Sequence, residues 1–164
     1  MSLRTMMIKT TNRFNTLFSH VPESLVLLVS RFAIASVFWR SVQTKITGGE
    51  FLDQSWQFWN ISTSTVMLFQ YEYGLPLLSP QAAAYAGTFA EFFLSLLIVS
   101  GLGTRFAALA LLGVTTVIQV FVFPSAWPTH IVWYAVLLVL LRQGGGRVSL
   151  DALMIRVCKL PDRS

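Results

Sequence analysis

The feature that most constrains the fold of this chain is an acidic residue inside a long apolar run. Residues 82–105 are long enough to cross a bilayer, for which about 20 residues are needed, and Glu91 lies near the middle of the run. A carboxylate at bilayer depth is costly unless it faces the bundle interior and finds a partner. Glu91 therefore predicts which side of this helix looks inward. Ala83, Gly87 and Ser95 lie on the same stripe, where small residues let neighbouring helices approach closely.

The composition agrees with a membrane protein. Of 164 residues, 54% are hydrophobic and 12% are charged, whereas a soluble domain has about 25% charged residues. The length suits one compact bundle and not two domains. The net charge of +5 could indicate nucleic acid, but the basic residues flank the apolar runs, which is typical of membrane orientation signals.

Four segments are predicted to cross the membrane: 24–42, 82–105, 106–123 and about 128–142. The long connection between the first two lacks an apolar run of spanning length. It interleaves aromatic and polar residues, which is typical of the headgroup region, and we expect a short interfacial helix near 55–69. The sequence thus predicts an all-α integral membrane protein, a four-helix transmembrane bundle.

The basic residues also predict the orientation of the bundle. Nine Lys and Arg residues fall in the N-terminal lead, the 102–105 turn and the tail, against Lys45 and Arg40 on the opposite side. Positive-inside reasoning places both termini in the cytoplasm. We divide the chain into a cytoplasmic lead (1–23), a membrane domain (24–142) and a cytoplasmic tail (143–164). The tail holds an amphipathic helix, capped by Ser149, that we expect to lie on the membrane surface.

The candidate site residues are the ionisable groups near the first two spans. Arg31 is seven residues, roughly 10 Å, inside the first span, and Glu91 is about 15 Å from the same boundary. We expect Glu91 to lie within hydrogen-bonding reach of Arg31 or another polar group, with Lys45 completing a polar intramembrane pocket. Two interpretations stay open: an ion pair that fixes helix register, or a pocket for a quinone head group or a proton.

The chain is poor in residues that hold redox centres. Its single cysteine, Cys158, excludes an intrachain disulfide, a CxxC pair and a cysteine zinc site. His20 and His130 lie at opposite ends of the chain, so we predict no metal site, no intramembrane bis-histidine haem and no covalent cofactor. His130, at a helix mouth, either satisfies a loop carbonyl or water or exchanges protons. A redox role therefore requires a diffusible cofactor, such as a quinone, or a partner protein.

A set of residues and motifs follows in order along the chain: Arg31, Lys45, YEYGLPLLSP at 71–80, Glu91, GLGTR at 101–105 and RQGGGRVSLD at 142–151. This ordered set resembles the DoxX family of small four-helix bacterial membrane proteins. The resemblance covers roughly residues 28–153. The chain departs from the family pattern at Gly145, where proline is expected, and in a longer, more aromatic first outer loop.

The resemblance implies a redox-associated protein of the bacterial cytoplasmic (inner) membrane. The family's namesake resembles a subunit of a thiosulfate:quinone oxidoreductase, and other members are linked to thiol-dependent oxidative-stress complexes or to gene clusters for copper-binding peptides. A quinone and a soluble or membrane oxidoreductase are the implied cofactor and partner. The alternatives are a non-enzymatic scaffold or assembly factor and a small-solute or proton carrier. No catalytic residue, electron donor or homo-oligomeric state is assigned.

Overall fold

The fold is all-helical in the part of the chain that the structure describes, which is residues 20–74, 76 and 78–158 together with Arg4, Met7, Lys9 and Thr16. In this computed structural model, four helical segments are long and apolar enough to cross a membrane, which confirms the predicted fold class. They are α2 (Glu23–Gln43), α4 (Pro80–Ser100), α5 (Thr104–Val117) with the π-helical turn η2 (Ile118–Val122), and α6 (Trp127–Gln143) after the short 3-10 helix η3 (Pro124–Ala126).

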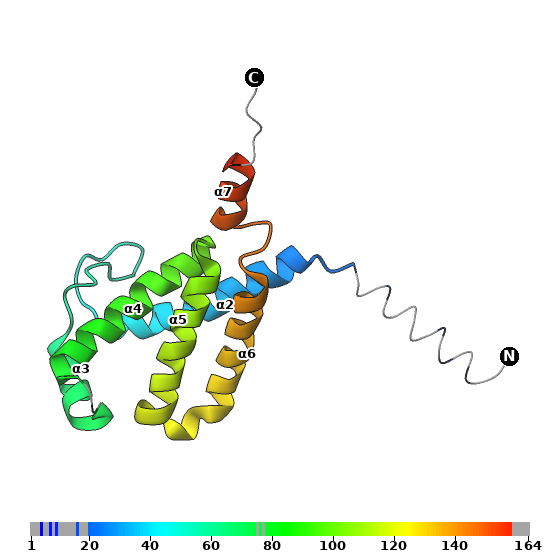
Figure 1. The fold of residues 1–164 in the computed structure, drawn as a ribbon. Helices are drawn as coiled ribbons and strands as arrows, with labels where there is room; N and C mark the ends of the chain where they lie inside the picture. Colours follow the sequence, from blue (N-terminus) through cyan, green and yellow to red (C-terminus); the bar gives the residue numbers. More distant parts are fainter. Residues whose placement is uncertain are drawn as a thin grey trace.

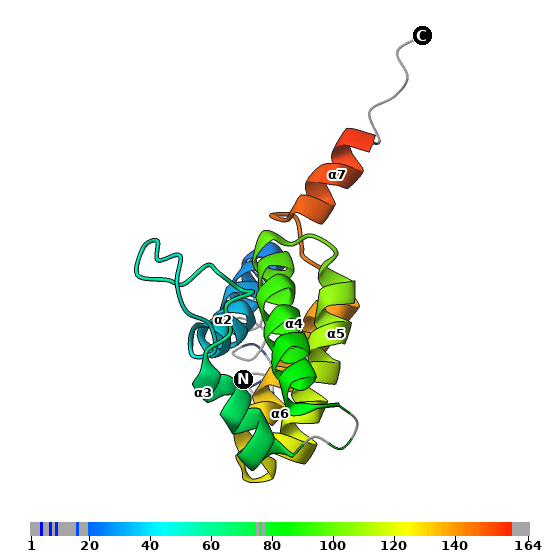
Figure 2. The same ribbon diagram turned by 90° about the vertical axis from the view of Figure 1, so that its left-hand side faces the viewer.

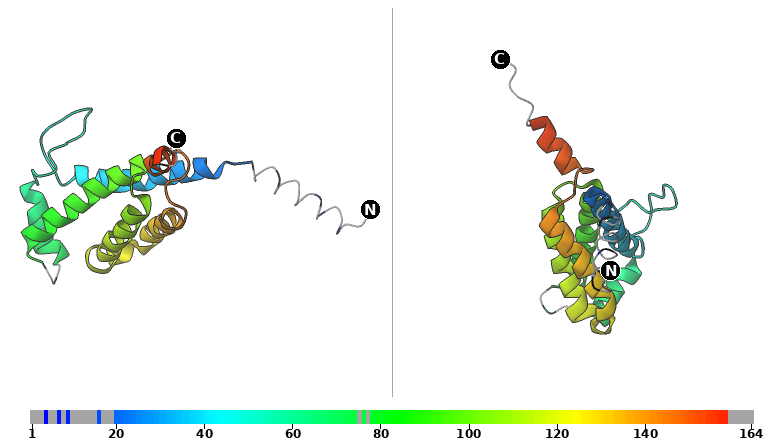
Figure 3. Two further views of the ribbon diagram at one scale, coloured as in Figure 1. Left: turned by 45° about the horizontal axis from the view of Figure 1, so that its top comes forward. Right: turned by 90° about the vertical axis from the view of Figure 1, so that its right-hand side faces the viewer.

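The four long helices form a closed ring of contacts. Helix α2 packs on α4 and α6, and α5 packs on the same two neighbours. In Figures 1 and 3, α5 and α6 lie side by side and cross the direction of α2. We call the end with the start of α2, the α4–α5 turn and the end of α6 the inner end, following the predicted orientation. The opposite end is the outer end.

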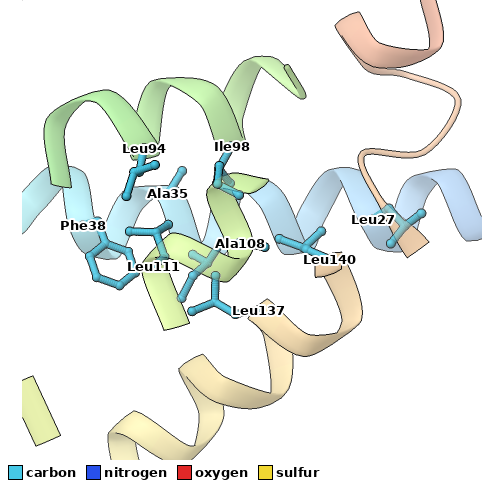
Figure 4. Packing of buried hydrophobic residues seen from close by; sticks show 11 residues of the cluster. Leu27, Ala35, Phe38, Leu94, Ile98, Ala108, Leu111, Leu137 and Leu140 are labelled. Atoms are coloured by element: carbon cyan, nitrogen blue, oxygen red, sulfur yellow. The ribbon is translucent and has the colours of Figure 1, made fainter. Parts of the chain in front are cut away.

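The core of the bundle lies between all four long helices. Its central side chains come from each of them, as Figure 4 shows for Phe38 on α2, Ile98 on α4, Leu111 on α5 and Leu137 on α6. Ala108 on α5 is fully buried among them. Small residues at such positions let helix backbones approach closely, so that dispersion contacts replace the hydrophobic driving force that lipid does not supply.

The first outer connection folds differently from the prediction. Residues 46–62 form a loop, and the helix expected near 55–69 instead comprises α3 (Thr63–Leu68) and a π-helical turn, η1 (Phe69–Tyr73). The predicted helix is therefore wrong over its first half. Positive φ angles at Gly48 (86°) and Leu52 (52°) turn the chain before it becomes helical. Ser62 then caps α3 by accepting a hydrogen bond from the Thr65 amide at 3.2 Å.

The tail helix is present where the sequence predicts it. Helix α7 (Leu150–Cys158) starts beside Ser149, whose hydroxyl accepts from the Ala152 amide at 3.1 Å. It stands away from the bundle in Figures 1 and 2, and its apolar side chains, including Leu153 and Met154, are exposed. Its contact with a membrane surface stays a prediction. The predicted N-terminal lead and the last residues of the tail lie largely outside the described residues.

Candidate functional site

Arg31 joins three segments at the inner end of the bundle. It is only 2% exposed, and its guanidinium donates to four backbone carbonyls: those of Ile98 and Val99 at the end of α4, and those of Gly145 and Val148 after α6. The last carbonyls of a helix lack their usual partner within the helix. Arg31 donates to the Val99 carbonyl and shares the Ile98 carbonyl with the Gly101 amide. We call this group the Arg31 clamp.

Glycine is required where the chain passes the clamp. Gly101 ends α4 in the left-handed conformation, with φ at 71°. A β-carbon added there would lie 2.9 Å from Cζ of Arg31 and 2.5 Å from Cβ of Ser149. Both the backbone angle and the close approach exclude larger residues.

Asp151 completes the inner end by capping a helix other than its own. Its carboxylate accepts from the amides of Gly103 (2.7 Å) and Thr104 (3.0 Å) and from the Thr104 hydroxyl, at the start of α5. Burial raises the pKa of Asp151, but these hydrogen bonds and the nearby Arg31 charge outweigh burial and hold the pKa below its ordinary value. Asp151 also lies in the first turn of its own helix, α7, where an acidic side chain is favourable.

Glu91 is buried at 2% exposure, and its partner is Lys45. The Lys45 ammonium lies 2.7 Å and 2.6 Å from the two carboxylate oxygens. Lys45 follows the end of α2, and its own carbonyl accepts from the Ser62 amide and the Thr65 hydroxyl at the start of α3. The cation is therefore positioned by two elements, while the acid is positioned by α4.

A cavity of about 730 Å³ lies beside this ion pair. Helix α2 ends at Gln43, whereas α4 continues outward from Glu91 to Pro80, so α3 and η1 pack against the outer half of α4 in place of α2. These short elements do not fill the space. The wall is mainly apolar, with Phe38, Phe69, Ala90, Val114, Ile118 and Trp133 among its residues, and it reaches the surface at exposed apolar side chains such as Val117 and Phe123.

Tyr73 is another residue of the same cavity wall. Its ring packs edge-on against Phe69 at 4.9 Å and Phe123 at 5.8 Å. Burial raises the pKa of Tyr73, and the carboxylates of Glu72 and Glu91 raise it further. The phenol therefore stays protonated, so it can donate a hydrogen bond to a ligand.

His130 lines the cavity from α6. It is 3% exposed, its ring lies 4.7 Å from that of Trp133, and its Nδ1 is 2.7 Å from Oε1 of Gln119. Gln119 belongs to η2 and in turn donates from Nε2 to the Pro124 carbonyl at 2.8 Å. The first turn of α6 is thereby linked to the start of η2.

The predicted group of ionisable residues thus divides between the two ends of the bundle. Lys45, Glu91 and His130 line one cavity, whereas Arg31 is not among its lining residues and pairs with backbone carbonyls instead of Glu91. Glu91 was expected to lie within hydrogen-bonding reach of Arg31 or another polar group, and its partner in the structure is Lys45. Arg31 lies at the inner end of α4, where its donors bind backbone carbonyls. Sequence reasoning missed Gln119, although it is the one strongly polar residue of the apolar run 106–123, which is the signal that could have identified it.

A comparison with known families fits this architecture. A family model described as DoxX matches residues 26–124. The chain belongs to the DoxX family. No curated protein and no solved structure matches it. The matched region of this DoxX protein runs from α2 to the start of η3 and includes Lys45, Tyr73, Glu91 and Gln119 but not His130. Together with its four candidate spans, family membership makes this a multi-pass membrane protein.

Proposed function

We propose that this DoxX protein binds the head group of a lipid-soluble quinone in the cavity and serves a partner oxidoreductase in a bacterial cytoplasmic membrane. The observation that carries the proposal is the pairing of a buried Lys45–Glu91 ion pair with a mainly apolar cavity of about 730 Å³. Ligand sites are typically concave and mainly apolar, with volumes of about 300–1,000 Å³ and few polar groups. A quinone head group, with polar oxygens on an apolar ring, matches that description.

Lys45 retains hydrogen-bonding capacity toward a ligand. An ammonium has three N–H donors, and the structure gives it two acceptors, the oxygens of Glu91, while its side chain stays 11% exposed. A quinone carbonyl accepts one such donor, and the Tyr73 phenol offers another. The bond from the Lys45 ammonium would be charge-assisted, and charge-assisted hydrogen bonds are stronger than those between neutral groups.

The surface around the cavity suits a ligand that arrives from lipid. The cavity reaches exposed apolar side chains of the bundle, at Val117 in α5 and Phe123 after η2. An isoprenoid tail would leave through this opening into the bilayer. The partner would supply the second redox centre, since the chain itself has a single cysteine and two histidines.

The direct test is binding of a short-chain benzoquinone to the purified, detergent-solubilised protein, combined with mass spectrometry of quinones extracted from the native preparation. A ligand that binds only the folded state stabilises it by about 2.7 kcal/mol at a hundredfold excess over Kd. We expect a saturable rise in melting temperature and a co-purified quinone.

Two variants separate a binding site from a structural ion pair. Gly113→Leu adds a side chain at the cavity wall, where an added β-carbon meets no atom within 4 Å, so the fold should persist while quinone affinity falls. Glu91→Gln keeps the shape but removes the charge and should weaken quinone binding. Glu50→Gln, the same change on an exposed loop residue, is the matched control and should change neither property.

A non-enzymatic scaffold is the second candidate function. The observation that favours it is α7, which stands away from the bundle with exposed apolar side chains such as Leu153 and Met154. A scaffold would use the charged residues only to hold the helices together. If no quinone raises the melting temperature and none is extracted from the native preparation, this second function replaces the first.

A further inference from the structure

The hydrogen-bonding direction of His130 follows from its neighbours. The Pro124 carbonyl only accepts, so the Gln119 atom that lies 2.8 Å from it is the amide nitrogen, and Oε1 faces His130. Oε1 in turn only accepts, so Nδ1 of His130 must carry the hydrogen in their 2.7 Å contact. Gln119 thereby fixes the tautomer of the neutral ring. A histidine that donates from Nδ1 presents an unprotonated Nε2.

The unprotonated Nε2 is available to a ligand. No described residue hydrogen-bonds to Nε2. Among the described residues, the one fully enclosed side-chain nitrogen or oxygen without a partner is Oγ1 of Thr88, so Nε2 of His130 is not fully enclosed and is in contact with open space. The open space beside His130 is the cavity that also contains Lys45. The cavity therefore presents a hydrogen-bond donor at Lys45 and a hydrogen-bond acceptor at His130, on different helical segments.

We propose that these two groups make the cavity selective for the hydroquinone form of the ligand, with Gln119 as the residue that positions His130 for this choice. The inference rests on the proposed quinone site and names the form that the site prefers. One hydroxyl oxygen of a hydroquinone accepts from Lys45, and the hydroxyl at the other end of the ring donates to Nε2 of His130. A quinone has only carbonyl acceptors, so an oxygen placed at Nε2 would leave two lone pairs facing each other.

The expected discrimination is modest but measurable. One hydrogen bond formed instead of left unmade typically corresponds to about a fivefold to tenfold change in affinity. A site that hydrogen-bonds a ligand hydroxyl also discriminates against the analogue without it, because its own polar group then stays unpaired.

The experiment measures the affinity of the solubilised full chain for a short-chain benzoquinone and for its hydroquinone, under anaerobic conditions. The reported quantity is the ratio of the two dissociation constants within each variant, which a general loss of stability does not move. The wild type should bind the hydroquinone about five to ten times more tightly.

Three variants test the residues that set this ratio. His130→Asn keeps a donor toward Gln119 and removes the acceptor at Nε2, so the ratio should fall to about 1. Gln119→Met keeps the side-chain length and frees the tautomer, so the ratio should also fall. Thr116→Val is the matched control, because Thr116 bonds to Tyr134 as another polar link between α5 and α6 and does not line the cavity. It should keep the wild-type ratio.

The outcomes separate this inference from the function on which it rests. If neither form binds the wild type, both the quinone site and its selectivity are overturned. If both forms bind the wild type equally, or if His130→Asn retains the preference, the site stands and the selectivity is overturned. A wild-type preference that both His130→Asn and Gln119→Met abolish supports the inference.

Discussion

Buried charged side chains have different kinds of hydrogen-bond partner at the two ends of the bundle. At the inner end, the donors of Arg31 are directed to four backbone carbonyls, and its neighbour Asp151 caps α5. At the outer end, Lys45 has a single partner, Glu91, beside a cavity of about 730 Å³. The first arrangement directs four of the five N–H donors of Arg31 to backbone carbonyls, away from the cavity, whereas the second leaves a donor at Lys45 and an acceptor at His130 beside the cavity.

Burial alone does not identify a ligand site in this bundle. Arg31, Glu91 and His130 are almost equally buried, at 2%, 2% and 3% exposure. What distinguishes them is whether the residue lines a cavity with hydrogen-bonding capacity left for a ligand, as His130 and the Lys45 partner of Glu91 do and Arg31 does not. By that criterion the inner end holds the fold together, and the outer end is where a ligand would bind.

The largest expected effect is the loss of the Arg31 clamp. Arg31→Ala leaves four carbonyls without their donor and should lower the free energy of unfolding by roughly 4 kcal/mol. Arg31→Lys should recover only part of this, because one ammonium cannot reach all four carbonyls. Arg40→Ala, on an exposed residue of the same helix, is the control and should have little effect. A thermal or denaturant melt measures all three, and an unchanged Arg31→Ala melt would contradict the clamp.

A somewhat smaller effect is expected at the outer ion pair. Glu91→Ala leaves the Lys45 cation without its partner and should lower the free energy of unfolding by about 3 kcal/mol. The double variant with Lys45→Met should lose less than the sum of the two single changes, because neither charge then stays unpaired. The same cycle with Arg31→Ala in place of Lys45→Met should be additive. Additive losses for Glu91 with Lys45 would exclude their coupling.

The pH dependence of stability at the inner end should come from Asp151. Its capping of α5 should contribute about 1 kcal/mol to the free energy of unfolding. Its folded-state pKa is below the ordinary value of 3.8, so the unfolded chain takes up a proton at higher pH than the folded chain does. The stabilisation is therefore complete above that ordinary value and is lost as the pH falls through the lower folded-state pKa. Asp151→Asn should be less stable than the wild type at pH 7, with the difference shrinking on acidification. A difference that stays constant in acid would contradict the assignment.

An effect of similar size but opposite sign is expected at Thr88 in α4. Its hydroxyl is the one buried side-chain oxygen or nitrogen without a hydrogen-bond partner among the described residues. Thr88→Val removes the unpaired hydroxyl at nearly constant shape, so stability should rise by about 1 kcal/mol. Because Thr88 does not line the cavity, quinone affinity should stay unchanged. A stability loss in the melt would show that the hydroxyl has a partner.

The number of membrane spans and most of their approximate bounds can be predicted from the amino-acid sequence alone. Apolar runs of spanning length leave few alternatives, since a membrane-spanning segment must satisfy its own backbone hydrogen bonds as a helix. The predicted span 82–105 begins two residues after the start of α4 at Pro80 and runs past its end at Ser100, because Gly101 turns the chain there. A carboxylate at the middle of a span was enough to predict that Glu91 faces inward, because lipid offers it no partner.

Which charged residues pair depends on how the helices pack in the tertiary structure. Distance along a helix placed Arg31 and Glu91 at similar depths, but it does not give the offset of α2 against α4, which depends on how four helices pack at once. That offset brings Arg31 to the end of α4 and Lys45 to Glu91, and it leaves the space that α3 and η1 do not fill. The tautomer of His130 likewise depends on Gln119 from another helical segment, a contact that no local pattern encodes.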